Sequence, residues 1–132
     1  MQLRLLALVA VVFTLGFALR SAPAAAAPES GMEPAELSRI EHLIQVVEQS
    51  TDRRFIRNGT SYNAATAARF LRLKWDHDRD RVHTAEDFVR EIASQSGTTG
   101  SHYRIRNADG SEEDSAVFLT RVLATRSPSA SK

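Results

Sequence analysis

Apolar residues recur with a helical period in four segments of this chain. They return every three or four residues, as they do on a helix that buries one face. These positions are Leu37, Ile40, Leu43, Ile44 and Val47; Ala64, Ala65, Ala67, Ala68, Phe70, Leu71 and Trp75; Ala85, Phe88, Val89, Ile92 and Ala93; and Val117, Phe118, Leu119, Val122 and Leu123. The pattern therefore predicts four helices.

Residues that favour helix starts precede each of these segments. Pro34 fits the first turn of a helix, where its missing N–H is not needed. Ser61 is expected to cap the second helix through its hydroxyl. The spacing of a capping box, in which a side chain and a backbone N–H bond reciprocally, occurs at Thr84 with Asp87 and at Ser111 with Asp114.

Two short segments have the composition and alternation of strands instead. Residues 54–57 are rich in strand-favouring side chains and end at Asn58-Gly59, a pair that tolerates positive φ and marks a turn. Residues 102–106 alternate apolar and polar side chains in the same way. A lone strand is not stable in water, so the two are expected to pair. The predicted fold is α+β and predominantly helical, with four helices and a small two-stranded β ribbon.

The N-terminal residues have the order of a cleavable signal peptide. A charged start at Arg4 precedes an apolar run over residues 5–19, which ends at an arginine and is followed by small residues. Cleavage after Ala26 or after Ala27 satisfies the small-x-small rule, but the second would leave proline at the new N-terminus. We therefore expect cleavage between Ala26 and Ala27. The alternative is a permanent anchor, for which the run is shorter than the roughly 20 residues that cross a bilayer.

The remainder of the chain is expected to form one domain. The predicted divisions are a signal peptide at 1–26, a mobile leader at 27–33, a single α+β domain at 34–126 and a disordered polar tail at 127–132. The sequence has no cysteine, which excludes disulfides, thiolate metal sites and a lipid-modified cysteine anchor. After cleavage we expect a soluble periplasmic or secreted protein with no membrane span.

Removing the signal peptide changes the charge of the protein. The full chain has a formal net charge of +1, whereas residues 27–132 hold 15 basic and 16 acidic side chains. Electrostatically driven nucleic-acid binding needs several uncompensated basic contacts, so this class of function is not expected. Within the domain, residues 53–81 hold eight basic and three acidic side chains. This segment indicates a basic surface suited to an anionic partner.

The first candidate site lies in that basic segment. Arg57, Asn58 and Gly59 precede the predicted start of the second helix, where backbone N–H groups and the helix dipole favour an anion. Arg72 and Lys74 are expected to add positive charge. In the alternative interpretation, Asn58-Gly59 is only the turn that the chain needs, and Arg57 lies flat on the surface.

A second candidate is a metal site in the connection after the second helix. His77, Asp78, Asp80 and His83 could surround a transition metal, although their spacing matches no standard ligand set. With Asp76, the aspartates also resemble part of a calcium loop, but that loop requires a glycine that is missing here. A solvated charged connection is the preferred interpretation. No cofactor is expected.

Two further groups of residues are weaker candidates. A hydrolase could combine a hydroxyl nucleophile with a histidine base, drawn from Ser94, Ser96 or Thr99 with His83 or His102. An aromatic sugar-binding platform could be formed by Tyr62, Phe70, Trp75 and Tyr103. For both groups a structural role in loops or in the core is the preferred interpretation.

The order of several short segments resembles the YfeK-like family. These segments are Phe55-Ile56-Arg57-Asn58-Gly59, Leu71-Arg72-Leu73-Lys74, Thr84-Ala85-Glu86-Asp87-Phe88-Val89, Ile92-Ala93-Ser94 and Gly100-x-x-Tyr103-x-Ile105. The resemblance covers residues from about 40 to 123. It implies a small exported bacterial protein of the Gram-negative envelope or periplasm. The family has no known activity, cofactor or catalytic residue that could be transferred to this chain.

These observations predict a non-catalytic binding or interaction domain rather than an enzyme. The expected partner is an anionic glycan or a partner protein of the envelope, contacted through the basic segment. The alternative is a small metal-dependent or serine-type envelope hydrolase.

Overall fold

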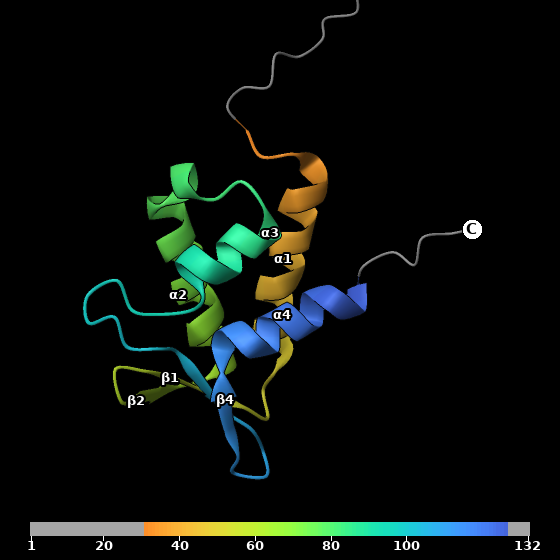
Figure 1. Cartoon of the computed structure of the whole chain (residues 1–132). Helices are drawn as coiled ribbons and strands as arrows, with labels where there is room; N and C mark the ends of the chain where they lie inside the picture. Colours follow the sequence, from red (N-terminus) through yellow and green to blue (C-terminus); the bar gives the residue numbers. More distant parts are fainter. Residues whose placement is uncertain (1–30, 127–132) are drawn as a thin grey trace, which may run out of the picture.

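Helices and short strands alternate along the part of the chain that the structure describes, residues 31–126 of the computed structural model (Figure 1). The helices are α1 (Pro34–Gln49), α2 (Ala64–His77), the short 3₁₀ helix η1 (Arg79–Arg81), α3 (Ala85–Asp87), the π-helical turn η2 (Phe88–Ile92) and α4 (Ser115–Arg126). The strands are β1 (Arg54–Arg57), β2 (Thr60–Tyr62), β3 (Arg104–Arg106) and β4 (Glu112–Asp114). Since η2 continues α3 directly, the predicted four helices and the α+β class are confirmed.

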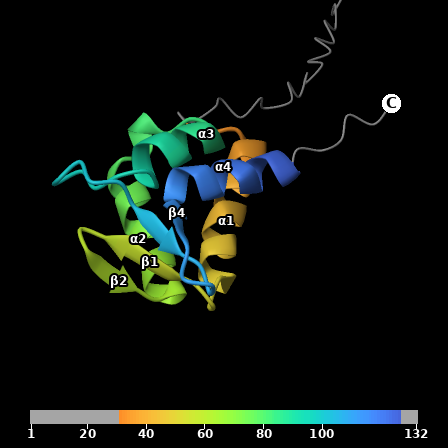
Figure 2. The same cartoon turned by 60° about the horizontal axis from the view of Figure 1, so that its bottom comes forward.

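The strands form one antiparallel sheet in the order β2-β1-β3-β4, at one end of the helices (Figure 1 and Figure 2). The predicted pairing of the two central strands is confirmed by the register of Phe55 with Ile105. The predicted two-stranded ribbon is wrong, because a three-residue strand returns along each outer side. At one of these turns Asn58 and Gly59 both have positive φ, which matches the right-handed twist of a hairpin and pairs Arg57 with Thr60.

Two of the predicted helix caps are wrong because they use residues that lie in the outer strands. Ser61 lies in β2, and α2 is capped instead by Asn63, whose side chain accepts a hydrogen bond from the N–H of Thr66 at 2.9 Å. Asp114 lies in β4, so α4 begins only at Ser115. The capping box of Thr84 with Asp87 is confirmed.

The hydrophobic core lies between the helices and the inner face of the sheet. Its fully buried side chains include Ile40, Leu43, Ile44 and Val47 of α1, which confirms most of the apolar face predicted for this helix. Leu37, predicted on the same face, is 41% exposed. Burying one such aliphatic side chain contributes about 1.5–3 kcal/mol, so α1 contributes substantially to the stability of the domain.

The signal peptide, the tail and most of the leader lie outside the described residues. Within residues 31–126, no helix is both long and apolar enough to cross a bilayer.

Candidate functional site

Arg57 occupies an unusual environment at the end of β1. Side chains alternate along a strand, so Arg57 shares the inner face with Phe55. Its guanidinium carbon lies 4.2 Å from the centroid of the Phe70 ring on α2. Its Nε atom is buried and has no hydrogen-bond acceptor among the described residues. A desolvated donor without an acceptor is costly, so this side chain is incompletely satisfied by the domain.

Lys74 lies one turn beyond Phe70 on α2 and is partly buried. Its Nζ donates hydrogen bonds to the backbone carbonyls of Ile92 at 2.9 Å and Gln95 at 2.7 Å, and to the Tyr103 hydroxyl at 3.3 Å. These are the three bonds that an ammonium group can donate. Burial lowers the pKa of Lys74; nearby Asp78 opposes this shift and Arg57 adds to it. The lysine thus satisfies backbone carbonyls at the end of η2 and in the loop that follows it.

Tyr103 joins the two cations. Its ring lies edge-on to Phe70, with 6.1 Å between ring centroids, and Lys74 Nζ lies 5.0 Å from its centroid. Burial raises the pKa of the Tyr103 hydroxyl, while the neighbouring Arg57 guanidinium opposes that rise. Two positive charges therefore converge on one buried tyrosine.

A small cavity adjoins this group. It has a volume of about 70 Å³ and is lined by Arg57, Tyr62, Thr66 and Phe70. Thr66 is exposed, so the cavity opens at the surface. We call Arg57 and its surroundings the Arg57 cluster, which consists of Arg57, Tyr62, Thr66, Phe70, Lys74 and Tyr103.

The charge of the Arg57 cluster is not balanced by a carboxylate in contact. Within residues 31–126, neither Arg57 nor Lys74 forms an ion pair, whereas most of the other arginines do. The paired arginines are Arg39, Arg72, Arg79, Arg81, Arg90, Arg104, Arg106 and Arg121. Two partly buried cations without an anion favour the binding of one.

The structure brings most of the predicted anion-site residues to this region, but not in the predicted arrangement. Asn58 and Gly59 form the hairpin turn beside Arg57 and do not precede the α2 N-terminus directly. The Asn58 side chain donates to Ser96 Oγ at 3.3 Å and accepts from Thr99 Oγ1 at 2.6 Å, which ties the turn to the loop after η2.

Arg72 lies apart from the Arg57 cluster. Thr66, Phe70 and Lys74 follow one another at intervals of four residues and share one face of α2, whereas Arg72 lies about 200° around the helix from Phe70. Its guanidinium pairs with Glu41 of α1 at 2.7 Å.

The aromatic and hydroxyl members of the cluster were not predicted as part of the anion site. Tyr62, Phe70 and Tyr103 were considered only with Trp75, which instead lies in the core, 5.8 Å from the ring centroid of Phe88. The four-residue spacing of Thr66, Phe70 and Lys74 was the signal that could have linked an aromatic residue to a cation.

The alternative metal residues do not converge in the structure. His77 Nδ1 lies 3.1 Å from Asp78 Oδ1, and Asp76 is bound by Arg79 at 2.7 Å. In the described part of the chain, no group of three or more histidine, aspartate or glutamate side chains is close enough to hold a metal ion.

The hydroxyl groups considered for a hydrolase are bonded locally. Ser94 Oγ donates to the carbonyl of Arg90, and Ser96 Oγ accepts from Asn58. The backbone of His102 pairs with Gln95, between the two serines, in an isolated β-bridge, while its ring Nδ1 lies 3.7 Å from Asp114 Oδ2. This arrangement holds the loop after η2 in place.

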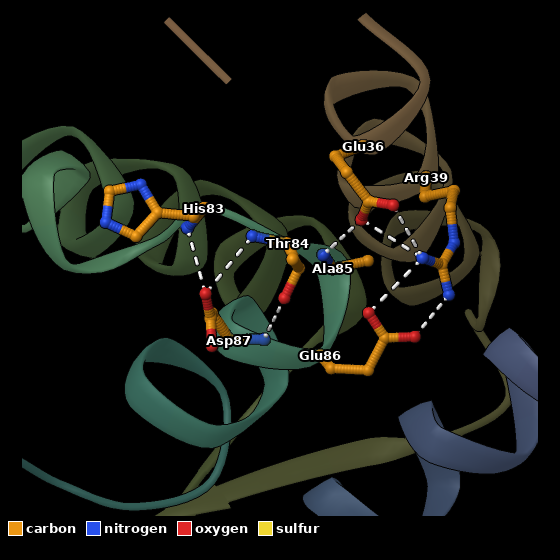
Figure 3. A network of polar contacts seen from close by, with 7 residues as sticks. All are labelled: Glu36, Arg39, His83, Thr84, Ala85, Glu86 and Asp87. Carbon is orange, nitrogen blue, oxygen red and sulfur yellow. Dashed lines mark hydrogen bonds and ion pairs between the residues drawn. The ribbon is translucent and has the colours of Figure 1, made fainter. Parts of the chain in front are cut away.

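A second polar group, which the sequence interpretation missed, joins α1 to α3 (Figure 3). Glu36 accepts a hydrogen bond from the Ala85 N–H at 2.7 Å, and Arg39 bridges Glu36 and Glu86. Arg39 lowers the pKa of Glu86. The acidic and basic groups are paired with each other, which indicates a structural junction between the two helices.

Asp87 completes this junction at the start of α3. Its carboxylate accepts hydrogen bonds from the backbone N–H groups of His83 and Thr84 (Figure 3). The His83 N–H lowers the pKa of Asp87, and Arg90 lowers it further. His83 therefore contributes its backbone rather than its ring to this part of the molecule.

A larger hollow of about 470 Å³ lies between η2 and α4. Its charged lining residues are Arg39, Glu86 and Arg90, all of which already form ion pairs. The Arg57 cluster is therefore the better candidate for binding an anion, because within residues 31–126 neither of its two cations is paired with a carboxylate.

The comparisons with known proteins agree with the resemblance seen in the sequence. The model of a family of unknown function, DUF5329, matches residues 34–127. The uncharacterized protein YfeK of Salmonella typhimurium (strain LT2) is 40% identical over 68 residues, which cover 52% of this chain and 57% of that protein, less than two thirds of its length. No solved structure is significantly similar to this chain. The matched residues comprise the whole folded domain, so the chain belongs to the DUF5329 family.

Proposed function

We propose that the protein is exported to the periplasm and acts there as a non-catalytic binding domain for an anionic component of the envelope, a glycan or a partner protein. The observation that carries this proposal is the pair of cations in the Arg57 cluster, which have no carboxylate in contact within residues 31–126. A partly desolvated charge is stabilised by an opposite charge, so an anionic ligand would complete the site.

Export is supported by the order of residues at the N-terminus, with cleavage between Ala26 and Ala27. Residues 27–132 are nearly neutral in total, so a local excess of positive charge, rather than the net charge, must select the partner.

A binding function is favoured over a catalytic one by the hydrogen bonds of the candidate groups. Lys74 donates all three of its ammonium hydrogens, and Ser94 and Ser96 are bonded to the adjacent chain. A nucleophile needs a general base held within hydrogen-bond distance of it. The hydrogen bonds of these groups do not bring a nucleophile and a base together.

The test begins with export. The full chain is expressed in a Gram-negative host, the periplasmic fraction is recovered, and the mass of the purified protein is measured. A mature N-terminus at Ala27 is expected. Protein that stays in the cytoplasm with an intact N-terminus contradicts the export part of the proposal.

The purified protein is then tested for binding to soluble peptidoglycan fragments and to polyglutamate at increasing salt. Binding is expected to weaken steeply with salt and to fall at least tenfold in Arg57→Gln. Arg54→Gln is the matched control, because Arg54 lies in the same strand on the opposite face and contacts Ser61 at 3.2 Å. If Arg57→Gln and Arg54→Gln bind alike, the Arg57 cluster is not the binding site.

A further inference from the structure

We infer that the cavity of the Arg57 cluster binds a single carboxylate group, presented at the end of a larger ligand. This inference rests on the proposed binding function and adds the chemical class of the group that is recognised. It is carried by the size of the cavity, the chemistry of its walls and the position of the guanidinium.

The size of the cavity limits what can enter it. A cavity of about 10–15 Å³ is enough for one water molecule, so about 70 Å³ admits a group of only a few heavy atoms. A carboxylate with its attached carbon has this size. A whole sugar ring does not fit, so the remainder of the ligand must lie outside, over the exposed Thr66.

The walls favour a group with few oxygen atoms. Two of the four lining residues, Tyr62 and Phe70, have aromatic rings, and Tyr62 and Thr66 each have one hydroxyl. The two oxygens of a carboxylate can be bonded by the guanidinium and these hydroxyls. A phosphate has more oxygens, and some of them would face the rings without a donor, which is costly.

The guanidinium is held ready for a planar partner. The guanidinium carbon of Arg57 lies over the Phe70 ring, and this contact restricts the movement of the guanidinium group. The Nε of Arg57 has no acceptor within residues 31–126, and its N–H lies parallel to an N–H of the adjacent Nη, so the two form a fork of donors. Two parallel N–H bonds from such a fork match the two oxygens of a carboxylate.

Lys74 supplies charge without contacting the ligand. Its ammonium hydrogens are committed to Ile92, Gln95 and Tyr103, so it has no donor left for a guest. It nevertheless holds a second positive charge beside Arg57 through the shared neighbour Tyr103. Direct recognition therefore belongs to Arg57, and Lys74 strengthens the field that attracts an anion.

The test titrates the purified full-length expression product, in the form in which it is recovered from cells, with sodium acetate and with sodium phosphate at constant ionic strength. The side-chain Nε–H resonance of Arg57 and the backbone resonances of Thr66 and Phe70 are followed by NMR. Acetate is expected to shift these resonances at concentrations at least tenfold lower than phosphate. Arg57→Lys keeps the charge but lacks the fork, and is expected to lose this preference. Arg54→Gln is expected to keep it.

Two carboxylates then identify the source of the ligand group. N-acetylmuramic acid represents a glycan acid, and N-acetylalanine represents the C-terminus of a peptide. A preference for either one supports the inference and names the source. Thermal unfolding of each variant shows that Arg57→Lys remains folded; if it does not, Thr66→Val, which removes only the Thr66 hydroxyl, is used and a weakened acetate response is expected.

The outcomes separate the inference from the proposed function. Equal responses to acetate and phosphate at Arg57 overturn the carboxylate inference and leave the anion-binding function standing. No response of Arg57 to any anion, together with polyglutamate binding that is unaffected in Arg57→Gln, overturns both.

Discussion

At the scale of single residues, the buried cations show how this domain uses charge in its interior. Lys74 is partly buried, and the domain meets its requirement for hydrogen bonds with two backbone carbonyls and a phenol. Arg57 lies in a comparable position but has an aromatic ring and an unsatisfied Nε instead. The hydrogen-bond donors of Lys74 are all satisfied within the domain, whereas Arg57 keeps a donor without an acceptor there.

Replacing Lys74 by methionine is expected to destabilise the domain by about 1–3 kcal/mol, because the carbonyls of Ile92 and Gln95 lose their donor. Urea unfolding followed by circular dichroism measures the change. Arg72→Met is the matched control on the same helix. Its ion pair with Glu41 is about half exposed, so a loss below about 1 kcal/mol is expected. Equal losses in the two variants would show that the Lys74 hydrogen bonds are unimportant.

At the scale of elements, the short outer strands explain the errors of the sequence interpretation. β2 has three residues between a turn and a helix cap, too few for any alternation to be recognised. In β4, Glu112 and Asp114 resemble the acidic first turn of a helix, yet they pair across the sheet with Arg106 and Arg104. Cross-strand ion pairs of this kind depend on the register of a hairpin, which the residues of one strand alone do not reveal.

The corrected cap of α2 makes a direct prediction. Asn63→Ala removes the acceptor for the Thr66 N–H and is expected to lower the free energy of unfolding by about 0.5–2 kcal/mol. Ser61→Ala is the control, because this hydroxyl lies in β2 and accepts a hydrogen bond from the exposed Arg54 side chain, and a change within about 0.5 kcal/mol is expected. Chemical denaturation of both variants decides which residue caps the helix. A larger effect at Ser61 contradicts the assignment to Asn63.

At the scale of the whole molecule, the junction of α1 and α3 connects the long first helix to the middle of the chain (Figure 3). Glu36 and Arg39 reach across to Ala85 and Glu86, nearly fifty residues later in the sequence. Exposed ion pairs contribute little individually, but a carboxylate that accepts a backbone N–H also satisfies a helix start.

This junction predicts how stability depends on acid pH. The pKa of Asp87 is lowered in the folded state from 3.8, mainly by the His83 N–H, so the folded protein binds fewer protons than the unfolded chain in this range. Its stabilisation is therefore fully present above pH 3.8 and is lost as the pH falls through the lower, folded-state value.

Asp87→Asn is expected to be less stable at pH 7 and to lose less stability between pH 5 and pH 2 than the unsubstituted protein. Thermal unfolding across this pH range measures both effects. Asp52→Asn, in the exposed turn before β1, is the control and should leave the slope unchanged. An unaltered acid slope in Asp87→Asn contradicts the assigned role of this carboxylate.

The local sequence alone determined the features that depend on neighbouring residues. The helical period of α1, the capping box at Thr84, the Asn58-Gly59 turn and the strand at 54–57 are all encoded within a few positions of the chain. Such features follow from backbone preferences and one-sided burial, which short segments already specify. The basic character of residues 53–81 was visible in the same way.

Only the tertiary structure decided which of these charges remain free. Arg72 and Lys74 are two residues apart, yet one pairs with α1 and the other caps the end of η2. Arg57 meets Phe70 and Tyr103 because β1, α2 and the region of β3 pack together, and no local pattern specifies that meeting. The balance of a buried charge depends on every element that surrounds it, so the candidate site became visible only in the folded chain.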